Sequence, residues 1–270
     1  MRFIKFHGLG NDYLVLSSEG ELSPARVRAI CDRHRGAGAD GILEPRPSAQ
    51  ATAGLRIWNP DGSEAEKSGN GLRIFARYLV DHRGVPLVHT VEVASGVGRC
   101  EVHADRGDVS VEMGVPTFEP LLVPCARPLL DSPVDVGGVE LRLTAVGLGN
   151  PHCVVFVDHD LDSLPWRDWG RALEVDPLFP NRTNVQFARV ILSDLVEVRV
   201  WERGAGETLA SGSSATAVVA AGQRLGRLGP AVTVMMPGGS LQVYRVEGGG
   251  LVQRGPVEEV GEFLLTRRAS

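Results

Sequence analysis

The tetrapeptide GLGN, residues 8–11, recurs as GLGN at residues 147–150, and an apolar segment follows each copy. A second pattern, Glu-x-x-x-Ser-Gly, occurs at residues 64–69 and again at residues 207–212, where each copy opens a helix-like segment. The two features repeat in the same order and at nearly the same spacing. Self-similarity of this kind is the sequence signature of a duplicated structural unit. The chain is therefore predicted to contain two similar halves.

The expected boundaries of the halves follow from a proline-rich stretch between Pro116 and Pro133, which is typical of a linker. We assign residues 1–115 to the first half and residues 116–262 to the second half. A short tail remains at residues 263–270, and its return to the first half is one option.

Most of the sequence alternates apolar and polar residues over short runs, which predicts strands, with few helices. Three helices are expected. One spans residues 24–35, between Ser23 as its N-cap and Gly36; the others run from about Gly69 to Gly84 and from about Gly212 to Gly226. The fold class is therefore α+β, and each half is predicted to be a curled sheet around one long helix. The candidate strands are residues 2–7, 13–17, 54–58, 88–93, 97–104, 107–113, 139–146, 153–158, 184–191, 195–201, 231–236 and 240–246.

Composition narrows the class of protein. The 270 residues are 43% hydrophobic and 23% charged, which is ordinary for a globular chain and excludes a disordered one. The net charge of −5 argues against a general nucleic-acid binder, and no long apolar run predicts a membrane span. The four scattered cysteines form no CxxC pair, which argues against a metal site and favours the reducing cytoplasm.

Each half presents a serine immediately before a helix, Ser68 in the first and Ser211 in the second. A helix N-terminus carries unpaired N–H groups and the positive end of the helix dipole, so it can hold a carboxylate. Two such elements on opposite faces of one carbon suit removing a proton from one face and returning a proton to the other. Both serines could equally be simple N-caps, since Ser is a preferred residue at that position.

Five ordered motifs resemble signatures of the diaminopimelate epimerase family and together cover about residues 1–265. They are FHGLGNDY at residues 6–13, NPDGSEA with GNGLR at 59–65 and 69–73, GNPHCV at 149–154, TNV at 183–185, and WERGAGET at 201–208.

The resemblance implies a cofactor-independent amino-acid epimerase of lysine and peptidoglycan precursor metabolism. It has two pseudo-symmetric domains, each a curled, mostly antiparallel sheet around a long central helix, with the active site in the cleft between them. Such an enzyme uses no pyridoxal phosphate and no metal, acts on a small amino acid, and is usually a homodimer. The family's acid and base stand at Ser68 and Ser211. The resemblance further implies these substrate-binding residues: Asn11, Asn59, Gly69, Asn70, Asn150, Asn184, Glu202, Arg203, Gly212 and Ser213.

The sequence differs from the family at the two residues that act as acid and base, because the family has cysteine at both positions 68 and 211. A thiolate is accessible at neutral pH, whereas an alcohol is a far weaker acid. Three explanations stay open. The serines are engineered; or the chain is a divergent isomerase with a carboxylate base such as Glu64, Asp61 or Glu202; or the protein binds an amino acid without turnover. A second departure is Gly41, where the family often has a polar residue.

Overall fold

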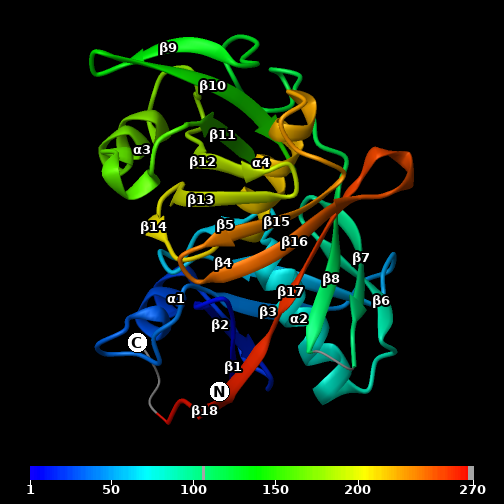
Figure 1. Cartoon of the computed structure of the whole chain (residues 1–270). Helices are drawn as coiled ribbons and strands as arrows, with labels where there is room; N and C mark the ends of the chain where they lie inside the picture. The colour runs from blue at the N-terminus through cyan, green and yellow to red at the C-terminus, as the bar shows by residue number, and fades with distance from the viewer. Residues whose placement is uncertain (105–106, 267–270) are drawn as a thin grey trace. The chain divides into compact units, whose positions relative to one another are not determined.

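The computed structural model describes residues 1–104 and 107–266 and divides the chain into two compact units. The first unit comprises Met1–Val111 together with the C-terminal segment that begins at Gly255, and the second comprises Glu112–Arg254. The elements of both units are labelled in Figure 1.

The first unit is built on a curled, mixed sheet. Its strands pair in the order β18-β1-β2-β3-β4-β6-β7-β8, with the short β5 also on β4. The pairs β2–β3 and β4–β6 are parallel and the others are antiparallel. The bounds are β1 (Arg2–Gly8), β2 (Asn11–Leu16), β3 (Ile42–Arg46), β4 (Ala53–Trp58), β5 (Glu64–Ala65), β6 (Val88–Val93), β7 (Gly96–Val102), β8 (Asp108–Gly114) and β18 (Glu258–Leu264).

The second unit repeats this topology strand for strand. Its strands pair in the order β9-β10-β11-β12-β13-β15-β16-β17, with the short β14 on β13. The pairs β11–β12 and β13–β15 are parallel and the others are antiparallel, as for the equivalent pairs β2–β3 and β4–β6 of the first unit. The bounds are β9 (Ser132–Val136), β10 (Val139–Gly147), β11 (Pro151–Phe156), β12 (Asn184–Leu192), β13 (Leu195–Glu202), β14 (Gly206–Thr208), β15 (Ala231–Met236), β16 (Gly239–Arg245) and β17 (Leu251–Pro256).

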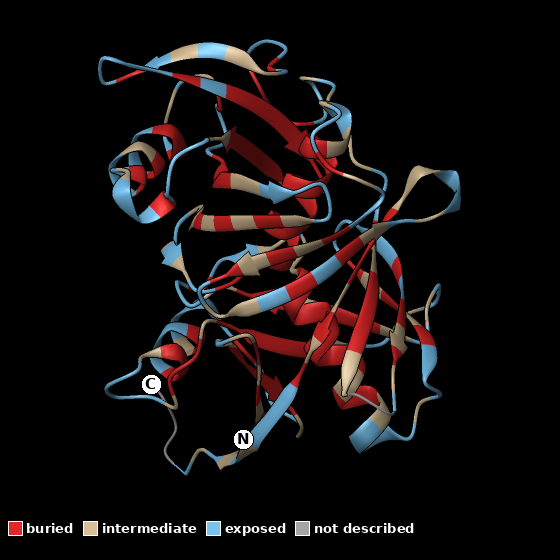
Figure 2. Cartoon of the chain, in the orientation of Figure 1, coloured by how far each residue is buried: buried red, intermediate tan, exposed pale blue. Residues whose placement is uncertain are grey.

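Each unit packs one long helix inside its sheet. The helix α2 (Gly69–Arg83) contacts β1 and β2 as well as β6 and β7, and α4 (Gly212–Arg224) contacts β10, β11, β12 and β16. Because each helix touches strands from both ends of the pairing order, the sheet must curl around it. Figure 2 shows both helices as mostly buried, and residues 212–222 of α4 are all buried. Small residues dominate that segment, which lets the strands approach its backbone closely.

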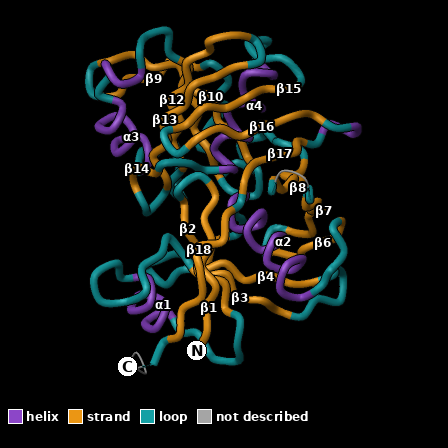
Figure 3. The backbone as a smooth tube through the Cα atoms, turned by 60° about the horizontal axis from the view of Figure 1, so that its bottom comes forward, coloured by secondary structure: helices purple, strands orange, loops and turns teal. Residues whose placement is uncertain are grey.

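Figure 3 shows how few helices accompany these strands. The remaining ones are α1 (Pro24–Cys31), α3 (Trp166–Glu174) and two 3₁₀ turns at Leu161–Ser163 and Glu247–Gly249. The prediction of an α+β fold with two similar curled-sheet domains is confirmed, and α2 and α4 begin where the repeated pattern placed them.

Two sequence-based expectations about helices were wrong. The first helix ends at Cys31 rather than near Arg35, because the Asp32 carboxylate accepts the backbone N–H groups of His34 and Arg35 and turns the chain. The helix α3 was not expected at all, although Trp166, Trp169 and Leu173 recur at helical spacing.

The units also divide the chain differently from the expected halves. Residues 255–262, assigned from sequence to the second half, lie with the first unit, because β18 pairs along the whole of β1 from Arg2↔Leu264 to His7↔Glu258. Of the expected tail, residues 263–266 continue in the first unit and residues 267–270 lie outside the described part of the chain.

Candidate functional site

In the first unit, Ser68 caps the start of α2. Its Oγ accepts the Gly71 N–H at 3.0 Å and lies 3.2 Å from the Tyr13 hydroxyl. Gly69 and Asn70, the first two residues of the helix, are buried. The serine is therefore an N-cap, and its hydroxyl also belongs to a small polar cluster at the positive end of a 15-residue helix.

Asn11 and Asn70 hold each other within that cluster. Asn70 Nδ2 donates to the side-chain oxygen of Asn11 at 2.7 Å and to its backbone carbonyl at 2.9 Å, while Asn70 Oδ1 accepts a hydrogen bond from Arg73 at 2.8 Å. Arg73 is fully buried, and this burial lowers the pKa of its guanidinium to about 10 against the opposing attraction of Asp108. The turn that carries Asn11 packs directly against Asn70, since a Cβ on Gly8 would lie 2.0 Å from Asn70 Oδ1.

A carboxylate pair supports Asn11 from the other side. Asp40 Oδ2 accepts hydrogen bonds from the Asn11 amide at 3.0 Å and from the Asp12 backbone N–H at 3.1 Å. Asp12 pairs with Lys5 at 2.7 Å and Arg33 at 2.7 Å. Burial alone would raise the pKa of Asp12, but the bonds from Arg33 and Lys5 outweigh it and lower the pKa to about 2. Asp12 therefore stays ionised and fixes the turn that presents Asn11.

The structure keeps Asn59 within its own turn. Its side chain donates to Ser63 Oγ at 3.0 Å, and its backbone N–H donates to the Ser63 carbonyl at 2.8 Å. Asp61 also bonds to Ser63, and Glu64 pairs with Arg56; each of these contacts lowers the pKa of the carboxyl group concerned. Asp61 and Glu64 are thus weak bases, which argues against the expectation that either replaces a thiolate.

In the second unit, Ser211 caps the start of α4 and accepts the Ser214 N–H at 3.5 Å. Ser211 and Ser213 are only 8% and 7% exposed. A Cβ at Gly212 would lie 2.2 Å from Gln253 Oε1, so this helix begins against a buried amide that only glycine can approach.

A chain of four polar side chains links the second GLGN turn to this helix. His152 Nε2 bonds to Asn150 Oδ1 at 2.9 Å, and Gln186 Nε2 lies 3.1 Å from His152 Nδ1 and 3.0 Å from Ser214 Oγ. Asn150 Oδ1 only accepts, so the imidazole proton sits on Nε2 and Nδ1 accepts from Gln186. His152 is completely buried, and this burial, with the charge of Arg203 adding to it, lowers its pKa to about 3.

Asn184 fixes the loop that carries Arg203. Its Oδ1 accepts the Arg203 backbone N–H at 3.0 Å, and its Nδ2 donates to the Pro151 carbonyl at 2.9 Å. Glu202 lies one residue earlier and accepts a hydrogen bond from the Thr208 hydroxyl at 3.0 Å.

Glu174, at the end of α3, holds the same loop from behind. Its carboxylate accepts the Trp201 indole N–H at 2.8 Å and the Gly204 N–H at 2.7 Å, and it pairs with Arg182. With only 6% of its surface exposed, Glu174 is a buried anchor for residues 201–204.

The structure therefore brings together Asn11, Ser68 and Asn70 in one unit, and in the other it links Asn150 to the start of α4 and Asn184 to Arg203. Sequence reasoning missed the residues that hold these groups in place: Tyr13, Asp40, Arg73, Glu174 and Gln186. Tyr13 and Arg73 lie within the motifs FHGLGNDY and GNGLR, so a local signal for them was present. The sequence holds no such signal for Asp40, Glu174 and Gln186, because their contacts form between separate segments of the chain.

Burial raises the pKa of Cys31 to about 12 and raises the pKa values of Cys125 and Cys153, so these thiols stay protonated. Within residues 1–104 and 107–266, no group of three or more His, Cys, Asp or Glu side chains could hold a metal ion. Across the same residues, no helix is long and apolar enough to cross a membrane.

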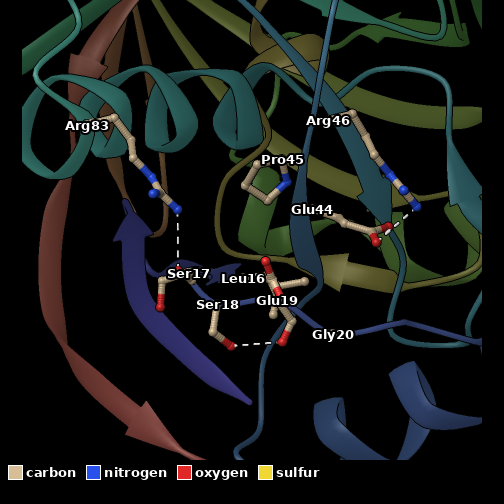
Figure 4. Close-up of a pocket in the computed structure, with 9 residues that line it drawn as sticks. All are labelled: Leu16, Ser17, Ser18, Glu19, Gly20, Glu44, Pro45, Arg46 and Arg83. Atoms are coloured by element: carbon tan, nitrogen blue, oxygen red, sulfur yellow. Dashed lines mark hydrogen bonds and ion pairs between the residues drawn. The ribbon is translucent and has the colours of Figure 1, made fainter.

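A pocket of about 360 Å³ lies elsewhere in the first unit, where the chain after β2 separates from β3 (Figure 4). The charged side chains of Glu44, Arg46 and Arg83 are paired. Glu44 binds Arg46 at 2.9 Å and the Trp58 indole N–H at 2.9 Å, and Arg83 donates to the Ser17 carbonyl at 3.3 Å. No predicted site residue lines it; its walls are Leu16, Ser17, Ser18, Glu19, Gly20, Glu44, Pro45, Arg46 and Arg83.

Comparison with known proteins decides the family. The family model described as diaminopimelate epimerase matches residues 3–119 and 144–260. The chain belongs to the diaminopimelate epimerase family. It is 43% identical over 277 residues to the diaminopimelate epimerase of Pelotomaculum thermopropionicum, covering 97% of this chain and 99% of that one. The Moorella thermoacetica diaminopimelate epimerase is 41% identical over 281 residues, with 98% and 100% covered.

The fold extends beyond this family. The crystal structure of a hydroxyproline epimerase from Agrobacterium vitis, solved with bound trans-4-hydroxy-L-proline, superposes with a TM-score of 0.75. The alignment covers 97% of this diaminopimelate epimerase family member and 91% of that chain at 16% sequence identity, so it shows a shared fold only.

Proposed function

We propose that this protein is an isomerase that epimerises diaminopimelate, by removing the proton from one face of Cα and returning a proton to the other. The match of the family model to both halves of the chain, with relatives at about 43% identity over nearly the full length, carries the proposal. The reaction would serve the supply of lysine and peptidoglycan precursors.

We assign the acid and base positions to Ser68 and Ser211. The substrate's α-carboxylate would bind the backbone N–H groups at the starts of α2 and α4, where two helix dipoles offset the negative charge that develops on deprotonating Cα. The first of these helix starts is Gly69–Asn70 and the second is Gly212–Ser213.

The remaining polar residues would recognise the substrate's amino and distal groups. Asn11 and Asn150 are the best supported, since each is held by a second side chain that fixes the direction of its amide. In the observed arrangement, His152 occupies the carbonyl oxygen of Asn150, so the amide NH₂ is the group left to donate to a ligand. Asn59, Asn184, Glu202 and Arg203 complete the assignment.

Exchange of the Cα hydrogen in D₂O tests the proposal. Purified protein is incubated with each stereoisomer of diaminopimelate, and loss of the Cα proton signal is followed by NMR. The matched variants are Ser68→Cys/Ser211→Cys, which restores the residues found in the family, and Ser68→Ala/Ser211→Ala, which removes both hydroxyls. We expect exchange in the native protein, faster exchange in the double cysteine variant, and none in the double alanine variant.

Two outcomes separate the remaining candidates. Exchange only in the double cysteine variant would mean that the native chain binds the amino acid without turning it over. Absence of exchange in both, with diaminopimelate binding detected by calorimetry, would refute the epimerase assignment.

Two further properties belong to the proposal. The protein would be cytoplasmic, because its four cysteines are all free thiols, as expected in a reducing compartment. It would be a homodimer: β18 has β1 as its one partner among the described strands, and Val260 and Leu264 on it are 54% and 63% exposed. Light scattering after size-exclusion chromatography, on the native protein and on Val260→Glu, measures the oligomer directly.

A further inference from the structure

The Tyr13 hydroxyl is the feature of the first unit that the family's chemistry leaves unused. Tyr13 lies on β2, opposite Phe6 on β1, and is only 7% exposed. Its hydroxyl oxygen is 3.2 Å from Ser68 Oγ, so the phenol and the alcohol form one hydrogen-bonded pair at the start of α2. This is the same serine that stands where the family has a cysteine.

The place of the Tyr13 ring depends on Gly41. A Cβ at residue 41 would lie 2.6 Å from Tyr13 Cε1 and 2.5 Å from the Trp58 carbonyl oxygen, so no other residue fits beside the ring. The sequence departs from the family at Gly41 as well as at Ser68, and the structure connects these departures through Tyr13.

We propose that Tyr13 is the proton acceptor behind Ser68, so that the Tyr13–Ser68 pair replaces the thiolate on this side of the reaction. This inference rests on the proposed epimerase function. In the deprotonation direction, Ser68 Oγ takes the proton from Cα while its own proton passes to the Tyr13 phenolate oxygen. The Cα–H bond breaks, the electron pair stays on the substrate as the carbanion, and the phenolate becomes a phenol. In the reverse direction both protons move back.

The hydrogen-bonding capacity of Ser68 permits this relay. A hydroxyl has one donor and two acceptor sites. One acceptor site receives the Gly71 N–H at 3.0 Å. Either oxygen of the Tyr13–Ser68 pair can be the donor; when Tyr13 is a phenolate, Ser68 donates to it and keeps one acceptor site for the substrate proton. Ser68 is of intermediate exposure, so the residue is not sealed inside the unit.

The chemistry of the phenol explains why the pair can do what serine alone cannot. A phenol is a far stronger acid than a serine alcohol, so a phenolate forms much more readily than an alkoxide. The positive end of the α2 dipole next to the pair favours the phenolate, and the burial of the ring opposes it. A base that is easier to populate at the working pH is the better catalyst, so of the two hydroxyls Tyr13 is the better final proton acceptor.

Cα exchange with diaminopimelate in D₂O tests the relay in two backgrounds. In the native background, Tyr13→Phe keeps the ring over Gly41 and should lower the exchange rate about 100-fold or more, with KM changed less than about 3-fold. In the Ser68→Cys background, where a thiolate needs no relay, Tyr13→Phe should change the rate less than about 3-fold. Tyr78→Phe is the matched control, because Tyr78 is a buried tyrosine on α2 whose hydroxyl binds Arg83.

The exchange rates in the two backgrounds either support or overturn the relay. A large loss in the native background with little loss in Ser68→Cys supports the relay, since a purely structural role of Tyr13 would reduce both. Equal losses in the two backgrounds, or no loss in the native one, overturn it and leave the epimerase assignment intact. Native protein without exchange, beside an active Ser68→Cys/Ser211→Cys variant, also overturns it; no exchange in either removes the epimerase assignment and the relay together.

Discussion

The buried imidazole of His152 makes the stability of the second unit depend on pH. Its pKa is lowered to about 3 by burial and by the charge of Arg203, while in the unfolded chain it protonates near 6.5. The folded protein therefore binds fewer protons in this range. The free energy of unfolding is therefore highest above pH 6.5, and it falls as the pH drops from 6.5 toward 3 and the unfolded chain takes up this proton.

The size of the effect follows from the two pKa values. Between pH 7.5 and pH 5, a histidine that stays neutral when folded reduces the free energy of unfolding by about 2 kcal/mol. His152→Gln removes this titration and keeps a side-chain N–H for Asn150. We therefore expect the loss of stability between the two pH values to be about 2 kcal/mol smaller in the variant than in the native protein.

Urea unfolding at pH 7.5 and pH 5, followed by tryptophan fluorescence, reports mainly on the second unit. Of the four tryptophans, Trp166, Trp169 and Trp201 lie there and Trp58 lies in the first unit. The readout is the difference between the two pH values, so a cost of the substitution common to both cancels. His34→Gln is the control, because His34 is exposed and should leave the pH dependence unchanged. Equal pH dependence in the native protein and His152→Gln would refute the reasoning. Burial also lowers the pKa of His89, which lies on β6 of the first unit, so the unfolding of that unit should show a pH dependence of the same sign.

Three substitutions test the supports of the site by urea unfolding. Gly8→Ala places a methyl group 2.0 Å from Asn70 Oδ1 and should destabilise by about 1–3 kcal/mol. Asp12→Ala leaves the Lys5 ammonium without its carboxylate at 2.7 Å and should cost about 3 kcal/mol, detected in the first unit. Glu174→Ala removes the acceptor of two N–H donors in the loop at 201–204 and should cost about 3 kcal/mol, detected in the second unit together with a shift in tryptophan fluorescence.

Matched controls exist for these substitutions. Gly229→Ala meets only one atom, the Ser193 carbonyl oxygen at 3.4 Å, and Asp168→Ala removes an exposed carboxylate from the same helix as Glu174. Both should change stability by less than about 0.5 kcal/mol. Losses as large as those of the test variants would show that the polar supports contribute nothing specific.

Local chemistry made much of the fold predictable. Ser68 and Ser211, each followed by glycine, are strong helix-start signals, and both helices begin at the residue expected. The repeated patterns predicted the duplication because they lie at equivalent places in two units of the same topology. The end of α1 was missed because Asp32 turns the chain by a side-chain contact that the helical pattern does not reveal.

The supports of the site could not be predicted from sequence, because their roles depend on strand register. Gln186 reaches His152 only because β11 and β12 pair in parallel with Val154 opposite Gln186, and the two segments are separated by α3 in the chain. Tyr13 reaches Ser68 across 55 residues of sequence. A motif can contain a supporting residue such as Tyr13, but the contact that gives the residue this role is set by tertiary structure.

The outer strand of the sheet comes from a different place in the chain in each unit. In the second unit this strand, β9, directly precedes β10, whereas in the first unit it is β18, supplied by the opposite end of the chain. The ends already meet: the Leu265 N–H donates to the Met1 carbonyl at 3.0 Å. A circular permutant opened between β17 and β18 would therefore encode two contiguous, equivalent runs of nine strands. In the natural order, ribosomal synthesis completes the second unit before it makes β18, so the first unit gains its outer strand only after the second unit has been made.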